Sequence, residues 1–243
     1  MRYIISAVPD VEEIFIDEIK NYLMNEIKFQ KIYKNFGNIK ISSIHPMAYV
    51  LDQNVNGGNM PTGLFPSITL VNESDGNNAR LEMPVNPEEN TITISEISEI
   101  ENTDLRKKLY IISDDDLLIL KDMVNEAPGN KILATGYTKY RTANMVMEIW
   151  DENMIIKNRI FDLMVNFFFG EKRFTIKDKY NIVVVEGSIR GQKGGNFNYD
   201  FGKMLFGGIL RFDVDFSTRQ YIIDSDVGVL EAVDHYKENI HNP

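Results

Sequence analysis

The chain has 243 residues, of which 43% are hydrophobic and 26% are charged, with a formal net charge of −10 and no cysteine. This length can bury one large core or two small ones, and the lack of cysteine excludes disulfides, thiolate nucleophiles and cysteine-ligated metal sites. The negative charge argues against a large phosphate-binding surface for nucleic acid.

The first predicted element is an amphipathic helix over 10–27. Asp10 and Glu13 have the spacing of a capping box. Apolar residues recur along one helical face: Val11, Phe15, Ile19, Tyr22, Leu23 and Ile27. A strand is expected at 38–41, followed by an exposed loop at 52–63 that is rich in Asn, Gly and Pro. The compact strand at 65–71 then ends in a polar turn at 72–78.

Residues 79–140 are interpreted as an insertion. Within them, 91–95 alternates as a strand. Ser113 and Asp116 form a second capping box, which predicts a helix that Pro128 and Gly129 close.

The second half of the chain has the clearest pattern. A strand at 143–150 leads into a helix that Asp151 is expected to cap and Gly170 to end. Short strands are predicted at 174–176 and 182–185. A hairpin rich in glycine and aromatic residues follows at 187–208, and a strand at 210–216 alternates strictly, so that one face should be wet. A short helix is expected at 227–236.

This order predicts an α+β fold, in which an antiparallel or mixed sheet has helices packed on one face and carries a long hairpin arm at 187–208. We expect a single domain over 1–243 with the insertion at 79–140. No apolar run approaches the roughly 18 to 20 residues that cross a bilayer, and the apolar N-terminal run at 1–6 is too short for a signal peptide. The protein is therefore expected to start in the cytosol.

We predict no catalytic residue, no cofactor and no metal site, and hence no enzyme. His45 precedes Pro46 and fits a turn or an extended connection, and His235 and His241 fit an exposed C-terminal segment. The aspartates at 114–116 are explained by the amino end of a helix dipole, and 224–228 departs from a calcium loop in spacing.

Glycines at 187–195 lack the Gly-Lys-Ser/Thr order and the following helix of a phosphate loop, so a mobile arm is expected there. The short basic stretches at 172–173 and 190–193 are interpreted as solvated loops.

Aromatic residues on a glycine background fit a subunit interface, because aromatic residues and Met are enriched where subunits meet. We expect interface contacts from the hairpin and from a second docking element in the 52–63 loop. These residues are Phe197, Tyr199, Phe201, Met204 and Phe206 in the hairpin, and Asn56, Asn59 and Met60 in the loop. The alternative is that the aromatics complete the core of the monomer.

The order of elements resembles the tail-terminator, or tail-completion, family of long-tailed bacteriophages and related contractile particles. The parts that carry the resemblance are the helix at 10–27, the Pro-Ser-Ile strand at 65–71, the strand and helix joined at Trp150, and the hairpin and strand at 182–216. Residues 79–140 have no counterpart in it.

The resemblance implies a structural virion protein, assembled in the host cytoplasm, that forms a homohexameric ring. Such a ring caps the tail tube and joins it to the neck beneath the head. Its partners would be further copies of itself, the tail tube and sheath proteins, and neck or connector proteins, with DNA only as transiting cargo and no membrane. An acidic surface would help DNA to slide through the channel.

Two other hypotheses stay open at this point. The first is a metal-dependent hydrolase or nuclease in which 114–116, or Asp213 and Asp215, hold magnesium. The second is a neck adaptor without ring symmetry.

Overall fold

The computed structural model describes residues 2–26, 39–46, 48, 64–77, 88–93, 95, 97–98, 113–198 and 204–224. The 52–63 loop, the helix predicted at 227–236, and Tyr199 and Phe201 lie outside these residues. None of the described helices is long and apolar enough to cross a membrane.

The chain divides into two compact units. The first unit comprises Met1–Pro9, Glu82–Lys139 and Thr218–Pro243, and the second comprises Asp10–Leu81 and Tyr140–Ser217. Two long strands, β5 (Lys131–Asp151) and β9 (Met204–Asp224), contribute residues to both units. The segment 82–139 therefore belongs to the same unit as the N-terminal and C-terminal segments of the chain.

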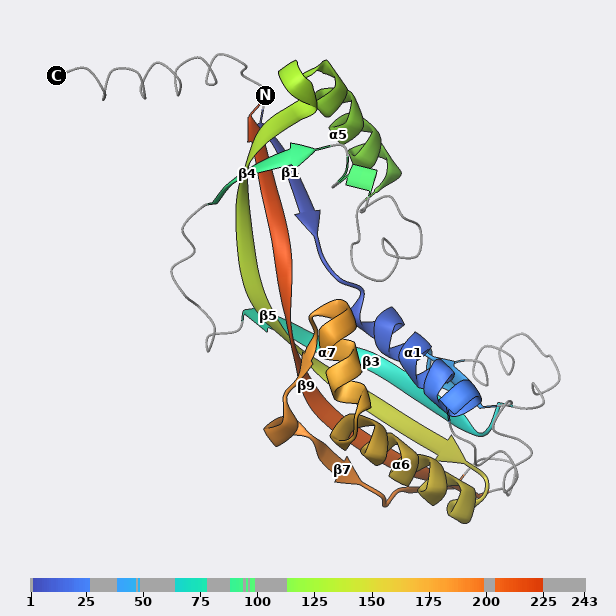
Figure 1. Cartoon of the computed structure of the whole chain (residues 1–243). Helices are drawn as coiled ribbons and strands as arrows, with labels where there is room; N and C mark the ends of the chain where they lie inside the picture. Colours follow the sequence, from blue (N-terminus) through green and yellow to red (C-terminus); the bar gives the residue numbers. More distant parts are fainter. Residues whose placement is uncertain are drawn as a thin grey trace, which may run out of the picture. The chain divides into compact units, whose positions relative to one another are not determined.

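The described residues of the first unit include antiparallel strands and helix α5 (Figure 1). Strand β1 (Arg2–Ala7) pairs with the end of β9, and β4 (Glu88–Thr93) pairs with the beginning of β5. Helix α5 (Asp114–Glu126) begins after Ser113, whose Oγ accepts a 3.1 Å hydrogen bond from the amide of Asp116. The predicted capping box is therefore confirmed, and the 3-10 turn η4 (Pro128–Asn130) follows the helix.

The second unit contains a mixed sheet. Strand β2 (Lys40–Ser42) lies parallel to β3 (Ser67–Asn77), and β3 is antiparallel to β5. Strand β9 lies next to β5 and pairs on its other side with β6 (Val183–Val184), β7 (Arg190–Gln192) and β8 (Asn196–Asn198). The short 3-10 turn η5 (Glu186–Ser188) joins β6 to β7.

Helices pack on this sheet, which confirms the predicted α+β class. They are α1 (Val11–Asn21), continued by the π turn η1 (Tyr22–Glu26), α6 (Met154–Phe169) and α7 (Lys172–Tyr180) (Figure 1). Phe212 on β9 lies against both Phe15 of α1 and Phe168 of α6, with ring centroids 5.6 and 4.2 Å away. Asp10 Oδ1 accepts from the amide of Glu13 at 3.0 Å, as the first capping box predicts.

Alternation along the long strands separates a dry face from a wet one. The residues buried toward the helices are Met145, Met147 and Ile149 of β5 and Leu210, Phe212, Val214 and Phe216 of β9. The intervening residues Arg211, Asp213 and Asp215 are exposed or half-buried on the opposite, open face. The wet face predicted for 210–216 is therefore present.

Two predicted boundaries are wrong. Strand β3 does not end at Asn72 but continues to Asn77, because an irregularity between Asn72 and Ser74 lets it keep pairing with β5. The N-cap of α6 is Asn153 rather than Asp151: Asn153 Oδ1 accepts from the amides of Ile155 and Ile156 at 2.9 and 3.3 Å. The Asp151 carboxylate instead accepts from the amide of Asn153.

The strand predicted at 174–176 is also wrong, because these residues lie in α7. The buried side chains Ile176 and Tyr180 are four residues apart, which is a helical spacing. The helix is tied to α1 through the buried Glu18, which accepts from Lys179 Nζ at 2.9 Å and from the Tyr180 hydroxyl at 2.8 Å. Burial raises the pKa of Glu18, but these two hydrogen bonds outweigh it and leave the pKa below its ordinary value.

The phenylalanine packing supports a direct test of the core. Phe168 is fully buried, whereas its neighbour Phe169 is 46% exposed. We expect Phe168→Ala to lower the free energy of unfolding by about 3–5 kcal/mol, because it leaves a cavity between α1, α6 and β9. Phe169→Ala should change it by about 0.5 kcal/mol or less. Urea denaturation of both variants measures this, and similar losses in the two would contradict the described core.

Candidate functional site

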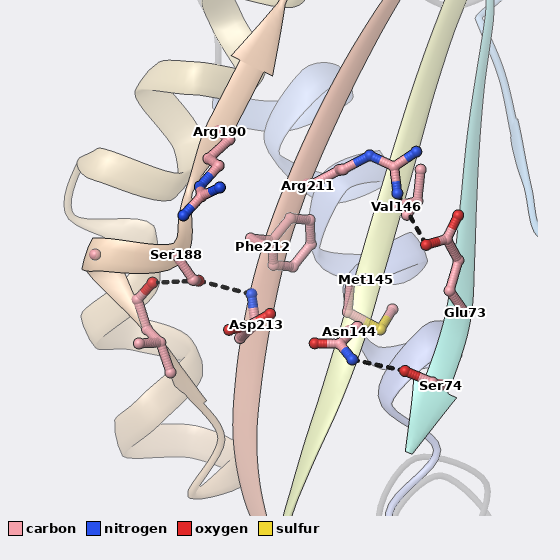
Figure 2. Close-up of a pocket in the computed structure, with 12 residues that line it drawn as sticks. Glu73, Ser74, Asn144, Met145, Val146, Ser188, Arg190, Arg211, Phe212 and Asp213 are labelled. Atoms are coloured by element: carbon pink, nitrogen blue, oxygen red, sulfur yellow. Dashed lines mark hydrogen bonds and ion pairs between the residues drawn. The ribbon is translucent and has the colours of Figure 1, made fainter. Parts of the chain in front are cut away.

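The open face of the sheet in the second unit carries a groove with a volume of about 510 Å³. It is bordered by β3, β5 and β9 and by the segment 185–190 (Figure 2). Its lining is mostly polar and comes from Glu73, Ser74, Asn144, Met145, Val146, Val185, Gly187, Ser188, Arg190, Arg211, Phe212 and Asp213. A concave surface with several convergent polar side chains is a candidate site for a ligand or for a partner's side chains.

Two arginines on neighbouring strands line this groove. Arg190 of β7 and Arg211 of β9 are directly opposite in the antiparallel pair, so their side chains lie on the same face. Arg211 Nη1 forms a 2.9 Å ion pair with Glu73 Oε2, to which it reaches across β5 (Figure 2). Within the described part of the chain, the Arg190 side chain has no acidic partner. With Glu73 paired to Arg211 and Asp213 also in the lining, the groove holds two positive and two negative side chains.

The walls of the groove are held by hydrogen bonds. On one side, Ser188 Oγ donates to the carbonyl of Val185 at 2.6 Å and accepts from the amide of Asp213 at 2.7 Å. On the other side, Asn144 Nδ2 donates to Ser74 Oγ at 2.6 Å. These bonds fix the polar side chains of the groove in place, and Arg190 is its cationic side chain that has no acidic partner among the described residues.

A second polar cluster lies on β5 and the connection after β2. His45 Nε2 is 2.9 Å from Glu148 Oε2, and Trp150 Nε1 donates to the same oxygen at 3.1 Å. The His45 and Trp150 rings meet edge to face at a centroid distance of 5.8 Å. The hydrogen bond from His45 lowers the pKa of Glu148 below its ordinary value, against the opposing effect of burial.

This cluster predicts a pH dependence. Because the pKa of Glu148 is lower in the folded state, its contribution to stability is present above the unfolded pKa of about 4.5 and is lost as the pH falls through the folded pKa. We expect Glu148→Gln to reduce the free energy of unfolding by about 1 kcal/mol at pH 7 and to have less effect near pH 3. Urea titrations at both pH values measure the difference. An equal loss at both would assign the effect to packing instead of charge.

The predicted interface residues are only partly described. Met204, at the start of β9, is 46% exposed, and Phe206 is half-buried. The backbone of Phe197 pairs with Leu205 between β8 and β9. The structure thus brings these parts of the hairpin together, while Tyr199, Phe201, Asn56, Asn59 and Met60 lie outside the described residues.

Packing explains several glycines of the hairpin. A Cβ atom on Gly207 would lie 2.7 Å from the Trp150 ring, and one on Gly208 would lie 2.8 Å from the Phe161 ring. The glycines therefore let two aromatic side chains approach the backbone of β9. No local sequence pattern indicates this packing, since the aromatic partners are about fifty residues distant in the chain.

Lys157 is a buried cation that sequence reasoning missed. Its side chain is 2% exposed, and its Nζ donates to the carbonyl of Lys193 in the connection between β7 and β8. Burial lowers the pKa of this amine, and the nearby Lys193 acts in the same direction. The one sequence feature that indicates the burial of Lys157 is its position on the apolar face of the predicted helix.

The acidic residues that were considered as metal ligands lie in different elements. The aspartates of 114–116 form the first turn of α5. Asp213 lies in the groove, whereas Asp215 Oδ1 accepts from Thr142 Oγ1 at 2.7 Å. Among the described residues, no group of three or more metal-binding side chains converges on one point.

The two basic stretches, 172–173 and 190–193, lie in different parts of the structure. Arg173, in α7, pairs with Glu186 at 2.6 Å between Nη1 and Oε2, and Arg190 joins the groove. Comparison with known proteins gives no further assignment: no protein-family model matches this sequence, and no curated protein matches it.

Proposed function

We propose that this chain is a structural virion protein that caps a phage tail tube and joins it to the neck as an oligomeric ring. The observation that supports this proposal most is that all the parts resembling tail terminators belong to one compact unit. The helix at 10–27, the strand at 65–71, the strand and helix at 145–169 and the hairpin at 182–216 all fall within the second unit.

These parts also share one hydrophobic core. Phe15 comes from the first part, Phe168 from the third and Phe212 from the last, and the three rings are in mutual contact at centroid distances of 4.2 to 6.0 Å. The segment without a counterpart, 79–140, falls almost wholly in the other unit. The resemblance in element order therefore corresponds to one folded body.

In the proposed ring, exposed side chains make the contacts between neighbouring subunits. Met204 and Phe206 expose apolar surface at the start of β9, where β9 pairs with the backbone of β8. Apolar side chains that remain exposed beside a polar face are typical of protein interfaces. The neighbours would be a second copy, the tail tube and sheath proteins, and neck proteins.

The test of the proposal is the mass of the particle in solution. Light scattering coupled to size exclusion, over a range of concentrations and with purified tail tubes added, should give a hexamer, either alone or on the tubes. A chain that stays monomeric at every concentration and does not bind tubes would refute the proposal.

A pair of exposed methionines supplies a matched variant and control. Met204 is 46% exposed on the hairpin and Met154 is 51% exposed on α6. Met204→Lys should weaken ring or tube association by about tenfold, because a charge replaces an apolar contact. Met154→Lys should leave the association unchanged, and neither should alter the melting temperature by more than a few degrees. If both variants associate equally well, the exposed side chain of Met204 is not part of the interface.

A further inference from the structure

Two hydroxyl groups of strand β3 are buried without a hydrogen-bond partner. Ser67 and Thr69 are 3% and 2% exposed, and within the described part of the chain their hydroxyl oxygens have no partner. A hydroxyl that is removed from water without a replacement hydrogen bond destabilises the fold. Buried hydroxyls in folded proteins are therefore mostly bonded to protein atoms or to ordered water.

Both hydroxyls belong to the face of the sheet that carries the Glu148 cluster. In the antiparallel β3–β5 pair, Thr69 is directly opposite Glu148, and Ser67 is directly opposite Trp150. Directly opposite residues point to the same face of a sheet, with Cβ atoms about 4.5–5.5 Å apart. The two hydroxyls are therefore cross-strand neighbours of a carboxylate and an indole ring.

The Glu148 carboxylate supplies an acceptor to this site. Its Oε2 atom accepts from His45 Nε2 and from Trp150 Nε1, at 2.9 and 3.1 Å. Among the described residues, no donor reaches its Oε1 atom. An ionised carboxylate has about four positions for hydrogen bonds, and each hydroxyl can both donate and accept. The site therefore combines one anionic acceptor with two hydroxyls.

The separation of these oxygens favours water over a metal ion. Neither hydroxyl is bonded directly to Glu148. A water molecule that forms two hydrogen bonds of about 2.8 Å joins oxygens up to about 5.6 Å apart. Calcium and magnesium ions need ligand distances of about 2.0–2.6 Å and several oxygens. Among the described residues, no three metal-binding side chains come together here or elsewhere.

We infer that this face of the sheet holds an ordered water molecule, bound by the hydroxyls of Ser67 and Thr69 and by Oε1 of Glu148. A buried water typically forms about three hydrogen bonds to groups that otherwise lack a partner, and these three residues supply them. The water donates to the carboxylate and to one hydroxyl and accepts from the other. Each hydroxyl thereby gains a partner.

The water supports the packing of Trp150 at the start of β9. With the water bound, Glu148 has hydrogen bonds on both carboxylate oxygens, and its Oε2 atom holds the indole N–H of Trp150. The Trp150 ring fills the space over Gly207, whose amide donates to the carbonyl of Gly195 at 2.8 Å. Loss of the water should therefore loosen Trp150 and expose the Gly207 amide to exchange.

A high-resolution crystal structure of the full chain tests the site directly. We expect a density peak about 2.6–3.2 Å from both the Thr69 hydroxyl and Glu148 Oε1. The peak should disappear in Thr69→Val, which removes the hydroxyl and keeps the shape of the side chain. Crystals soaked in rubidium chloride identify a monovalent cation, because the ion gives an anomalous signal and water does not. The inference is overturned by the lack of a peak or by an anomalous signal at its position.

The stability of Thr69→Val gives an independent measurement, because a water-bound hydroxyl and an unpartnered one predict opposite signs. If the hydroxyl binds the water, the substitution lowers the melting temperature by several degrees, because the remaining groups lose a partner. If the hydroxyl has no partner, its replacement by a methyl group raises the melting temperature, and this result would contradict the inference.

Hydrogen exchange separates the effect on Trp150 from a general loss of stability. The Gly207 amide should exchange severalfold faster in Thr69→Val, relative to the other amides of β9. Ile68→Val is the matched control, because Ile68 is the next residue of β3, is also buried and points to the other face of the sheet. It should leave the relative exchange of Gly207 unchanged. Equal acceleration in the two variants would show that the water does not hold Trp150 in place.

Discussion

The second unit depends on the packing of three phenylalanines from distant parts of the chain. Phe15, Phe168 and Phe212 bring α1, α6 and β9 together, and Phe167 extends the cluster to Tyr22 at a centroid distance of 5.2 Å. Because Phe212 must point toward the helices, its neighbours on β9 must point away from them. The core therefore decides that Arg211 and Asp213 lie on the open face, where the groove forms.

A second constraint places the hairpin. Trp150 and Phe161 occupy the space above Gly207 and Gly208, and the buried Lys157 bonds to the backbone of Lys193. Any larger residue at these glycines would have to displace a ring or the strand. This packing keeps β7 in register with β9 and so brings Arg190 opposite Arg211. Met204, three residues before Gly207, remains 46% exposed.

The net charge of the chain limits which surfaces of two copies can associate. A formal net charge of −10 opposes the association of two copies of this chain. Association in such a protein has to come from local exceptions. Arg190 in the groove and Met204 at the start of β9 are exceptions of two kinds, one electrostatic and one hydrophobic.

The sequence by itself determined the elements whose signals are local. The capping residues Asp10 and Ser113, and the alternation that makes one face of β9 wet, follow from spacings of a few residues. Only the tertiary structure decided that 174–176 is helical and that Arg190 lies opposite Arg211. These features depend on partners far away in the chain, and strand register and burial are properties of such pairings that no short pattern contains.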